Sequence, residues 1–69
     1  MYILIKSKLK NEETEYTGYG IAYPRDNYIE VIASDISPDR EFVNSIIDKC
    51  NKYNAAPEQA ADIIYDSLE

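Results

Sequence analysis

The spacing of hydrophobic residues changes once along this chain, and that change limits what the chain can fold into. Up to about residue 34, hydrophobic residues alternate with polar or small ones, which is typical of β-strands. From residue 38 onward they recur every three or four positions, which is typical of amphipathic helices. Ten isoleucines and seven tyrosines also favour a sheet. The sequence therefore predicts strands first and helices second.

Turn-forming residues divide the alternating part into three segments. The polar residues 10–14 and the sequence PRDN at 24–27 are the expected turns. The expected strands are residues 2–9, 15–24 and 28–34. Because the connections are short, we expect an antiparallel meander. The expected helices are residues 38–53 and 57–69, and Pro57 opens the second one.

The hydrophobic stripes of the two helices need a sheet face to cover them. The stripe of the first helix comprises Phe42, Val43, Ile46, Ile47, Cys50 and Tyr53, and that of the second comprises Ala60, Ala61, Ile64 and Leu68. One core between two layers follows, so we predict a single α+β domain over residues 1–69. Its expected architecture is a three-stranded antiparallel meander packed on one face by two C-terminal helices, in the order β-β-β-α-α. Gly18 and Gly20 are expected to admit a helix backbone or to mark a bulge.

The segment SDISPDREF at residues 34–42 has the composition of either a metal site or a helix start. Three residues match the first, third and fifth ligand positions of a calcium loop: Asp35, Ser37 and Asp39. The glycine of the sixth position is replaced by Arg40, which argues against calcium. A helix start accounts for the whole segment, with Ser37 as the N-cap and Pro38 as the first helical residue. We therefore expect no metal here.

Residues that carry common catalytic chemistry are scarce. The absence of histidine removes His-based triads and imidazole metal sites. Cys50 lies on the stripe of the first helix, where a buried thiol keeps its proton and stays unreactive. Asp62 and Asp66 have the spacing of paired carboxylates, but a solvated outer face is the commoner reason for that spacing. We predict that the protein is not an enzyme and holds no cofactor or metal.

Charge and cysteine content narrow the classes of partner and compartment. Thirteen acidic and seven basic residues give a net charge of −6. This charge repels nucleic-acid phosphates and anionic membranes, so we expect no direct binding to either. No hydrophobic run approaches the roughly 20 residues of a membrane span. The single cysteine, Cys50, allows no internal disulfide, which favours a reducing cytoplasm.

Four tyrosines are the candidate partner-binding residues. Tyr19 and Tyr23 lie on one face of the second strand, and Tyr2 and Tyr28 lie on neighbouring strands. We expect the four to form an aromatic patch on the open face of the sheet. Such a patch suits a protein partner, because tyrosine is enriched at protein interfaces. Cross-strand tyrosine pairs that only shield the sheet explain the pattern equally well.

Three segments of the chain resemble a known family: GYGIAY, ASDISPDREFV and PEQAADIIYDSL. That family consists of short uncharacterised proteins of clostridia and related Firmicutes, with a Y-G-I strand, a D-I-S-x-D helix start and a P-x(4)-D closing helix. The similarity spans residues 18–68 and implies the architecture and a bacterial cytoplasmic setting, since the family has no assigned activity. Its members carry a histidine after the proline of the last helix, where this chain has Gln59 or Ala60. A function that rests on that histidine would be absent here.

The acidic charge, the tyrosines and the lack of catalytic residues favour a small non-enzymatic protein–protein interaction module, with regulation as one use of it. Its unidentified protein partner would bind the open sheet face or an edge strand, and pairing of two first strands would give a homodimer. The alternative is an acidic nucleic-acid mimic that binds the basic groove of a nucleic-acid-binding protein. A mimic needs one continuous stripe of carboxylates, here Asp35, Asp39, Glu41, Asp48, Asp62 and Asp66.

Overall fold

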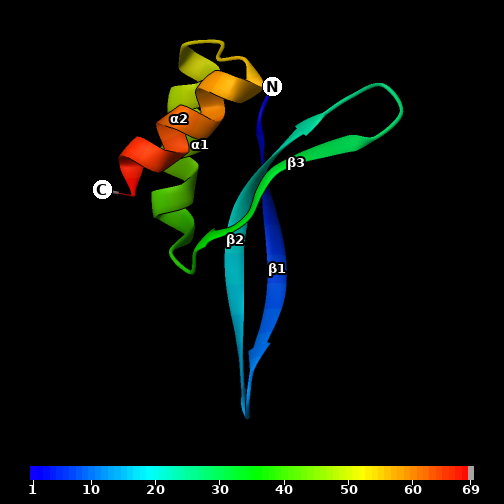
Figure 1. Cartoon of the computed structure of the whole chain (residues 1–69), viewed down its shortest axis with the longest axis vertical. Helices are drawn as coiled ribbons and strands as arrows, with labels where there is room; N and C mark the ends of the chain where they lie inside the picture. Colours follow the sequence, from blue (N-terminus) through cyan, green and yellow to red (C-terminus); the bar gives the residue numbers. More distant parts are fainter. Residues whose placement is uncertain (69) are drawn as a thin grey trace.

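The computed structural model describes residues 1–68 and shows three strands followed by two helices within them (Figure 1). The strands are β1 (Ile3–Asn11), β2 (Thr14–Pro24) and β3 (Ile29–Ser37), and the helices are α1 (Arg40–Lys52) and α2 (Pro57–Ser67). β2 lies between β1 and β3, and both pairings are antiparallel. The predicted α+β class and the β-β-β-α-α order are confirmed. The predicted helix end at residue 69 lies outside the described residues.

The helices pack together on one face of the sheet, and the core lies between the two layers (Figure 1). The buried residues of this core are Tyr2, Ile21, Val43, Ile46, Ile47, Cys50, Ala55, Ala60 and Ile64. The predicted stripe of α1 is confirmed except at Tyr53, which is 68% exposed at the C-cap. On α2 the prediction is wrong for Ala61 and Leu68, which are exposed. Ile63 packs against the core on that helix.

The start of α1 differs from the prediction. Its N-cap is Asp39, whose carboxylate accepts hydrogen bonds from the backbone N–H groups of Glu41 (3.1 Å) and Phe42 (3.2 Å). Ser37, the predicted cap, still belongs to β3, where it pairs with Tyr19. The Ser37 hydroxyl accepts a hydrogen bond from the N–H of Asp39 at 3.0 Å. Strand pairing therefore overrides the helix signal at Ser37, and the helix begins two residues later.

The two glycines of β2 face away from the helices. A Cβ atom at Gly20 would collide with the backbone carbonyl of Ala33, and one at Gly18 would collide with the Asp35 side chain. The register of β2 and β3 shifts on both sides of Ile21, so the predicted bulge is confirmed. The alternative, that the glycines admit a helix backbone, is wrong because β3 occupies the space beside Gly20.

The β1–β2 hairpin extends past the helices as an arm, which we define as residues 8–17 (Figure 1). Asn11 pairs with Thr14, so the loop at its end has two residues. Glu12 has a positive φ of 54°, as the first residue of a type II′ turn does. No residue of the arm belongs to the core cluster.

Candidate partner-binding surface

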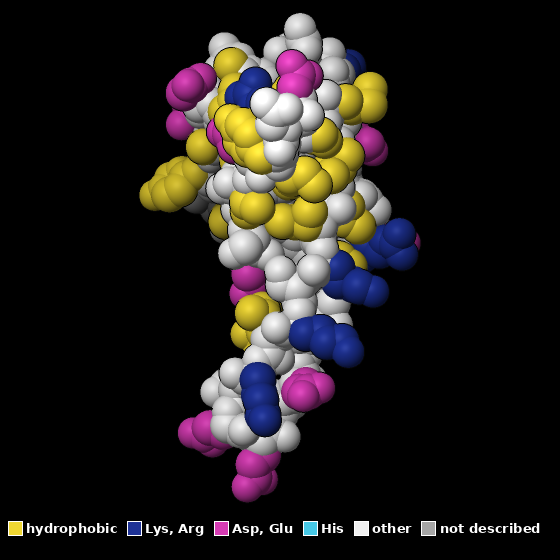
Figure 2. Space-filling model, turned by 90° about the vertical axis from the view of Figure 1, so that its right-hand side faces the viewer, with side chains coloured by type: hydrophobic (Ala, Val, Ile, Leu, Met, Phe, Trp, Pro, Cys, Tyr) yellow, Lys and Arg dark blue, Asp and Glu magenta, His cyan; other side chains and the backbone are white. Residues whose placement is uncertain are grey.

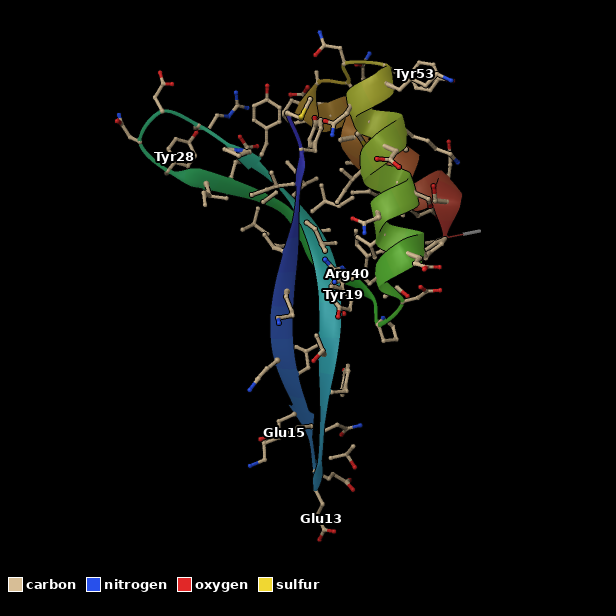
Figure 3. The ribbon with its side chains drawn as sticks, turned by 180° about the vertical axis from the view of Figure 1, so that it is seen from behind. Glu13, Glu15, Tyr19, Tyr28, Arg40 and Tyr53 are labelled. Carbon is tan, nitrogen blue, oxygen red and sulfur yellow. The ribbon has the colours of Figure 1, made fainter. Side chains whose placement is uncertain are left out.

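The structure does not place the four tyrosines in one exposed patch. Tyr2 is buried in the core, and Tyr19 and Tyr23 are partly buried against it. Tyr28 is exposed beside the turn between β2 and β3 (Figure 3). Their predicted placement on the open sheet face is therefore wrong. Tyr19 and Tyr23 share a face with the fully buried Ile21, so the helices cover the face that carries them.

The contacts of Tyr2 hold the beginning of β1 against the end of α1. Its N–H donates to Asn51 Oδ1 at 2.7 Å, and its hydroxyl donates to the carbonyl oxygen of Ala55 at 2.7 Å. Its ring meets Tyr23 edge to face, with 4.9 Å between centroids. Burial raises the pKa of the Tyr2 hydroxyl. These contacts are those of a packing residue.

A charged pair flanks this aromatic contact. The Arg25 guanidinium lies 4.7 Å from the centroid of the Tyr23 ring. The Arg25 guanidinium also forms an ion pair with Glu30, with 2.9 Å between Nη2 and Oε1. Its hydrogen bond to the Glu30 carboxylate raises the pKa of Arg25. Arg25, held by Glu30, thus covers one face of the Tyr23 ring. Of the four predicted tyrosines, Tyr28 keeps its ring largely accessible.

The uncovered face of the sheet carries aliphatic side chains in neighbouring strands. The register aligns Ile3 with Ala22 and Ala22 with Val31, and it aligns Pro24 with Ile29 in the next row. We call this surface the open face, and it consists of Ile3, Ile5, Ala22, Ile29 and Val31. Ile3, Ile29 and Val31 are 37%, 57% and 53% exposed. Figure 2, which views the side away from the helices, shows hydrophobic side chains gathered across the body of the molecule.

Charged side chains lie around the open face and not on it. Lys6, Lys8 and Lys10 have the same orientation in β1 as Leu4, which packs toward the core. They therefore follow one side of the hairpin, and basic side chains succeed one another along the arm in Figure 2. Asp35, beside Gly18, borders the open face farther along the sheet. The open face is thus a neutral hydrophobic surface on an acidic protein.

A family of unknown function (DUF6514) matches residues 1–69, the whole chain. The chain belongs to this family. No curated protein and no solved structure matches it. The predicted resemblance to a family without assigned activity is confirmed. The clostridial range of that family and its short motifs remain predictions.

The other candidate residues of this DUF6514 chain lie apart from the open face. Asp62 and Asp66 are exposed on α2, and Lys49 lies beside Asp66 in a shallow hollow between the helices. Among residues 1–68, no three His, Cys, Asp or Glu side chains lie together in a way that holds a metal ion. Neither helix of the described chain has the length and hydrophobicity to cross a membrane.

Cys50 and Gln59 have identifiable structural positions. Cys50 is fully buried, as predicted, and burial raises the pKa of its thiol. The Gln59 side chain accepts a hydrogen bond from the backbone N–H of Ala56 at 3.0 Å. At one of the two positions where the resemblance implies a histidine, this chain therefore has a residue that stabilises the start of α2, and at the other it has the buried Ala60.

Proposed function

We propose that this protein is a small non-enzymatic interaction module that binds a protein partner through the open face. One observation supports this most: Ile3 of β1 and Val31 of β3 are exposed on either side of Ala22, and Ile29 is exposed in the next row of β3, on a sheet whose other face is covered. Isolated exposed aliphatic residues need no explanation, but contiguous ones mark interaction sites. Burial of each half-exposed side chain would contribute about 1 kcal/mol to binding.

A regulatory use in the bacterial cytoplasm belongs to the same proposal. Cys50 is a free, buried thiol, so neither folding nor the open face depends on an oxidising compartment. A module that binds through an uncharged surface would regulate its partner by covering part of the partner's surface. The proposed role is therefore that of a cytoplasmic binding protein.

The acidic mimic is the weaker proposal. Its carboxylates must form one uninterrupted stripe, as the phosphates of nucleic acid do. Lys49 lies beside Asp66, and Arg40 stands between Asp39 and Glu41 at the start of α1. Basic groups therefore interrupt the acidic surface, which favours the interaction module.

Site-specific photo-crosslinking in the native cell tests the proposed function. A photo-reactive residue at Val31 is compared with one at Tyr65, which is 67% exposed on α2 and lies on the other layer. We expect a discrete crosslinked protein from position 31 and none from position 65. The same products from both positions, or none from either, would contradict the proposal.

A further inference from the structure

We propose that the occupant of the open face is a second copy of this chain, packed sheet against sheet about a two-fold axis. The inference rests on the proposed function and identifies its partner. A two-fold interface uses the same patch on both subunits, so the patch must complement itself. A neutral, aliphatic sheet face meets this condition, because sheets pack face to face through interdigitated aliphatic side chains.

The distribution of charge favours a second copy over a different protein of either charge. A basic partner is attracted to the carboxylates, and Asp39, Glu41, Asp48, Asp62 and Asp66 belong to the helix layer, while Asp35 borders the open face farther along the sheet, beside Gly18. An acidic partner is attracted to Lys6, Lys8 and Lys10, which follow β1 toward the end of the arm with the orientation of Leu4 and not that of Ile3 and Ile5. Neither attraction acts at the open face, so its complement is another uncharged hydrophobic face. Stacking two open faces also keeps both helix layers, with their acidic groups, on the outside.

Face-to-face stacking is also favoured over the pairing of two β1 edges. An antiparallel pair centred on Lys8 would place Lys8 opposite Lys8 and Lys6 opposite Lys10. Like charges directly opposite each other destabilise a strand pair. Lysines along β1 instead protect that edge from pairing. The predicted homodimer therefore forms through the open face and not through the edge of β1.

The open face is small, and this sets the expected strength of the dimer. Ala22 of the open face is already fully buried, and the four accessible residues per chain are far fewer than the roughly 20 to 30 per partner of a standard stable interface. We therefore expect a dissociation constant on the order of 10–100 µM. Because two chains of net charge −6 repel each other, added salt screens the repulsion and strengthens this dimer. Binding of an acidic surface to a basic partner weakens with salt, so the sign distinguishes the two cases.

Sedimentation equilibrium of the full chain tests the inference. The mass is measured from about 10 to 500 µM protein, at about 50 and 500 mM salt, so that the Debye length changes several-fold. We expect the mass to rise with protein concentration from 7.9 kDa toward twice that value. In high salt this rise should begin at a lower protein concentration than in low salt. A mass of 7.9 kDa throughout, or association that weakens with salt, would overturn the inference.

Two variants locate the interface. The double variant Ile29→Thr, Val31→Thr keeps β-branched side chains, and therefore strand propensity, while it places hydroxyl groups on the open face. We expect it to weaken the dimer by at least about tenfold, with an unchanged circular dichroism spectrum. Tyr65→Thr removes an equally exposed hydrophobic residue from α2 and should leave the dimer unchanged. Equal weakening by both variants would overturn the inference.

The crosslinking experiment separates failure of this inference from failure of the proposed function. A crosslink from position 31 to a second copy of the chain supports both. A crosslink from position 31 to a different protein leaves the proposed function standing and removes the second copy as the occupant. The absence of a crosslink specific to position 31 removes both.

Discussion

At the scale of single residues, Asn54 has an unusual backbone conformation that forms the end of α1. Its φ is 49°, in the left-handed region. The N–H of Ala55 donates to the carbonyl of Cys50 at 3.0 Å, and the N–H of Asn54 donates to the carbonyl of Asn51 at 3.2 Å. This is the Schellman pattern of a helix end, which requires one left-handed residue, usually glycine or asparagine. It directs the chain so that Ala55 is buried beside the end of α1.

Substitution of Asn54 tests this helix end. Asn54→Ala should lower the free energy of unfolding by about 1 kcal/mol, because a Cβ-bearing residue without a polar side chain is strained at positive φ. Asn54→Gly, the control, should leave it unchanged or raise it slightly. Urea unfolding followed by circular dichroism measures both variants. Equal stability of Asn54→Ala and Asn54→Gly would argue against the left-handed end.

Cys50 gives the protein a predictable response to alkali. Burial raises its pKa above the ordinary thiol value of 9.0, so the unfolded chain loses the thiol proton at a lower pH than the folded one. The contribution of the protonated thiol to the free energy of unfolding is fully present below pH 9.0, and it is lost as the pH rises through the folded-state pKa. Urea unfolding between pH 7 and about 10 should show stability falling above pH 9. Cys50→Ala should flatten that fall, and an identical pH profile in the variant would assign it to other groups, such as Tyr2.

At the scale of elements, the start of α1 allows a direct comparison of two candidate caps. Asp39→Ala should lower the free energy of unfolding by about 1 kcal/mol, because two backbone N–H groups lose their acceptor. Ser37→Ala should cost less, since the Ser37 hydroxyl accepts a single hydrogen bond from a residue outside the helix. Thermal unfolding of the two variants measures the difference. A larger loss in Ser37→Ala would restore the cap predicted from the sequence.

The periodicity of the sequence determined the elements and the order in which they occur, but not which face of the sheet the helices cover. β2 offers Tyr19, Ile21 and Tyr23 on one side and small residues on the other, and helices can pack on either kind of surface. Ile29 and Val31 look like core residues in the sequence, because hydrophobic character alone does not distinguish a core strand position from an exposed one. The sequence did contain one indication of this exposed surface. Both sides of the predicted sheet are hydrophobic, but two helices cover only one of them.

Local signals also failed where pairing between distant residues decided the outcome. Ser37 and Pro38 have the composition of a helix start, and the sequence places them there for sound local reasons. The extension of β3 to Ser37 depends on its pairing with Tyr19, which lies 18 positions earlier and across two register shifts. Bulges alter register in ways that alternation within one strand does not reveal. The buried position of Cys50, by contrast, followed from helical spacing alone.

At the scale of the whole molecule, the chain forms a thin body with a projecting arm. Its extents are 39 × 32 × 17 Å, and Figure 1, which looks down the shortest axis, shows the helix pair and the sheet side by side. Glu13 marks the far end of the arm in Figure 3. Since the arm contributes nothing to the core cluster, its length and the stability of the body are separable.

Shortening the arm tests this separation. Deletion of residues 8–11 and 14–17 removes four cross-strand pairs and leaves Ser7 opposite Gly18 around the same two-residue loop. An even number of pairs preserves the alternation of hydrogen-bonded and non-hydrogen-bonded positions, so every remaining side chain keeps its face. We expect the free energy of unfolding to change by less than about 1 kcal/mol in urea. A markedly larger loss would show that the arm supports the body.

The hydrogen bonds of Tyr2 have a consequence for the order of folding. They join residues 49 and 53 positions apart, whereas each hairpin closes over a short loop. Closure of a long loop carries a larger entropic cost, so contacts within the hairpins and helices form first and the beginning of β1 docks late. By microscopic reversibility the same segment detaches early during unfolding. The amide proton of Tyr2 therefore exchanges with solvent through a local opening of lower free energy than the opening that exposes Ile21 at the centre of the sheet.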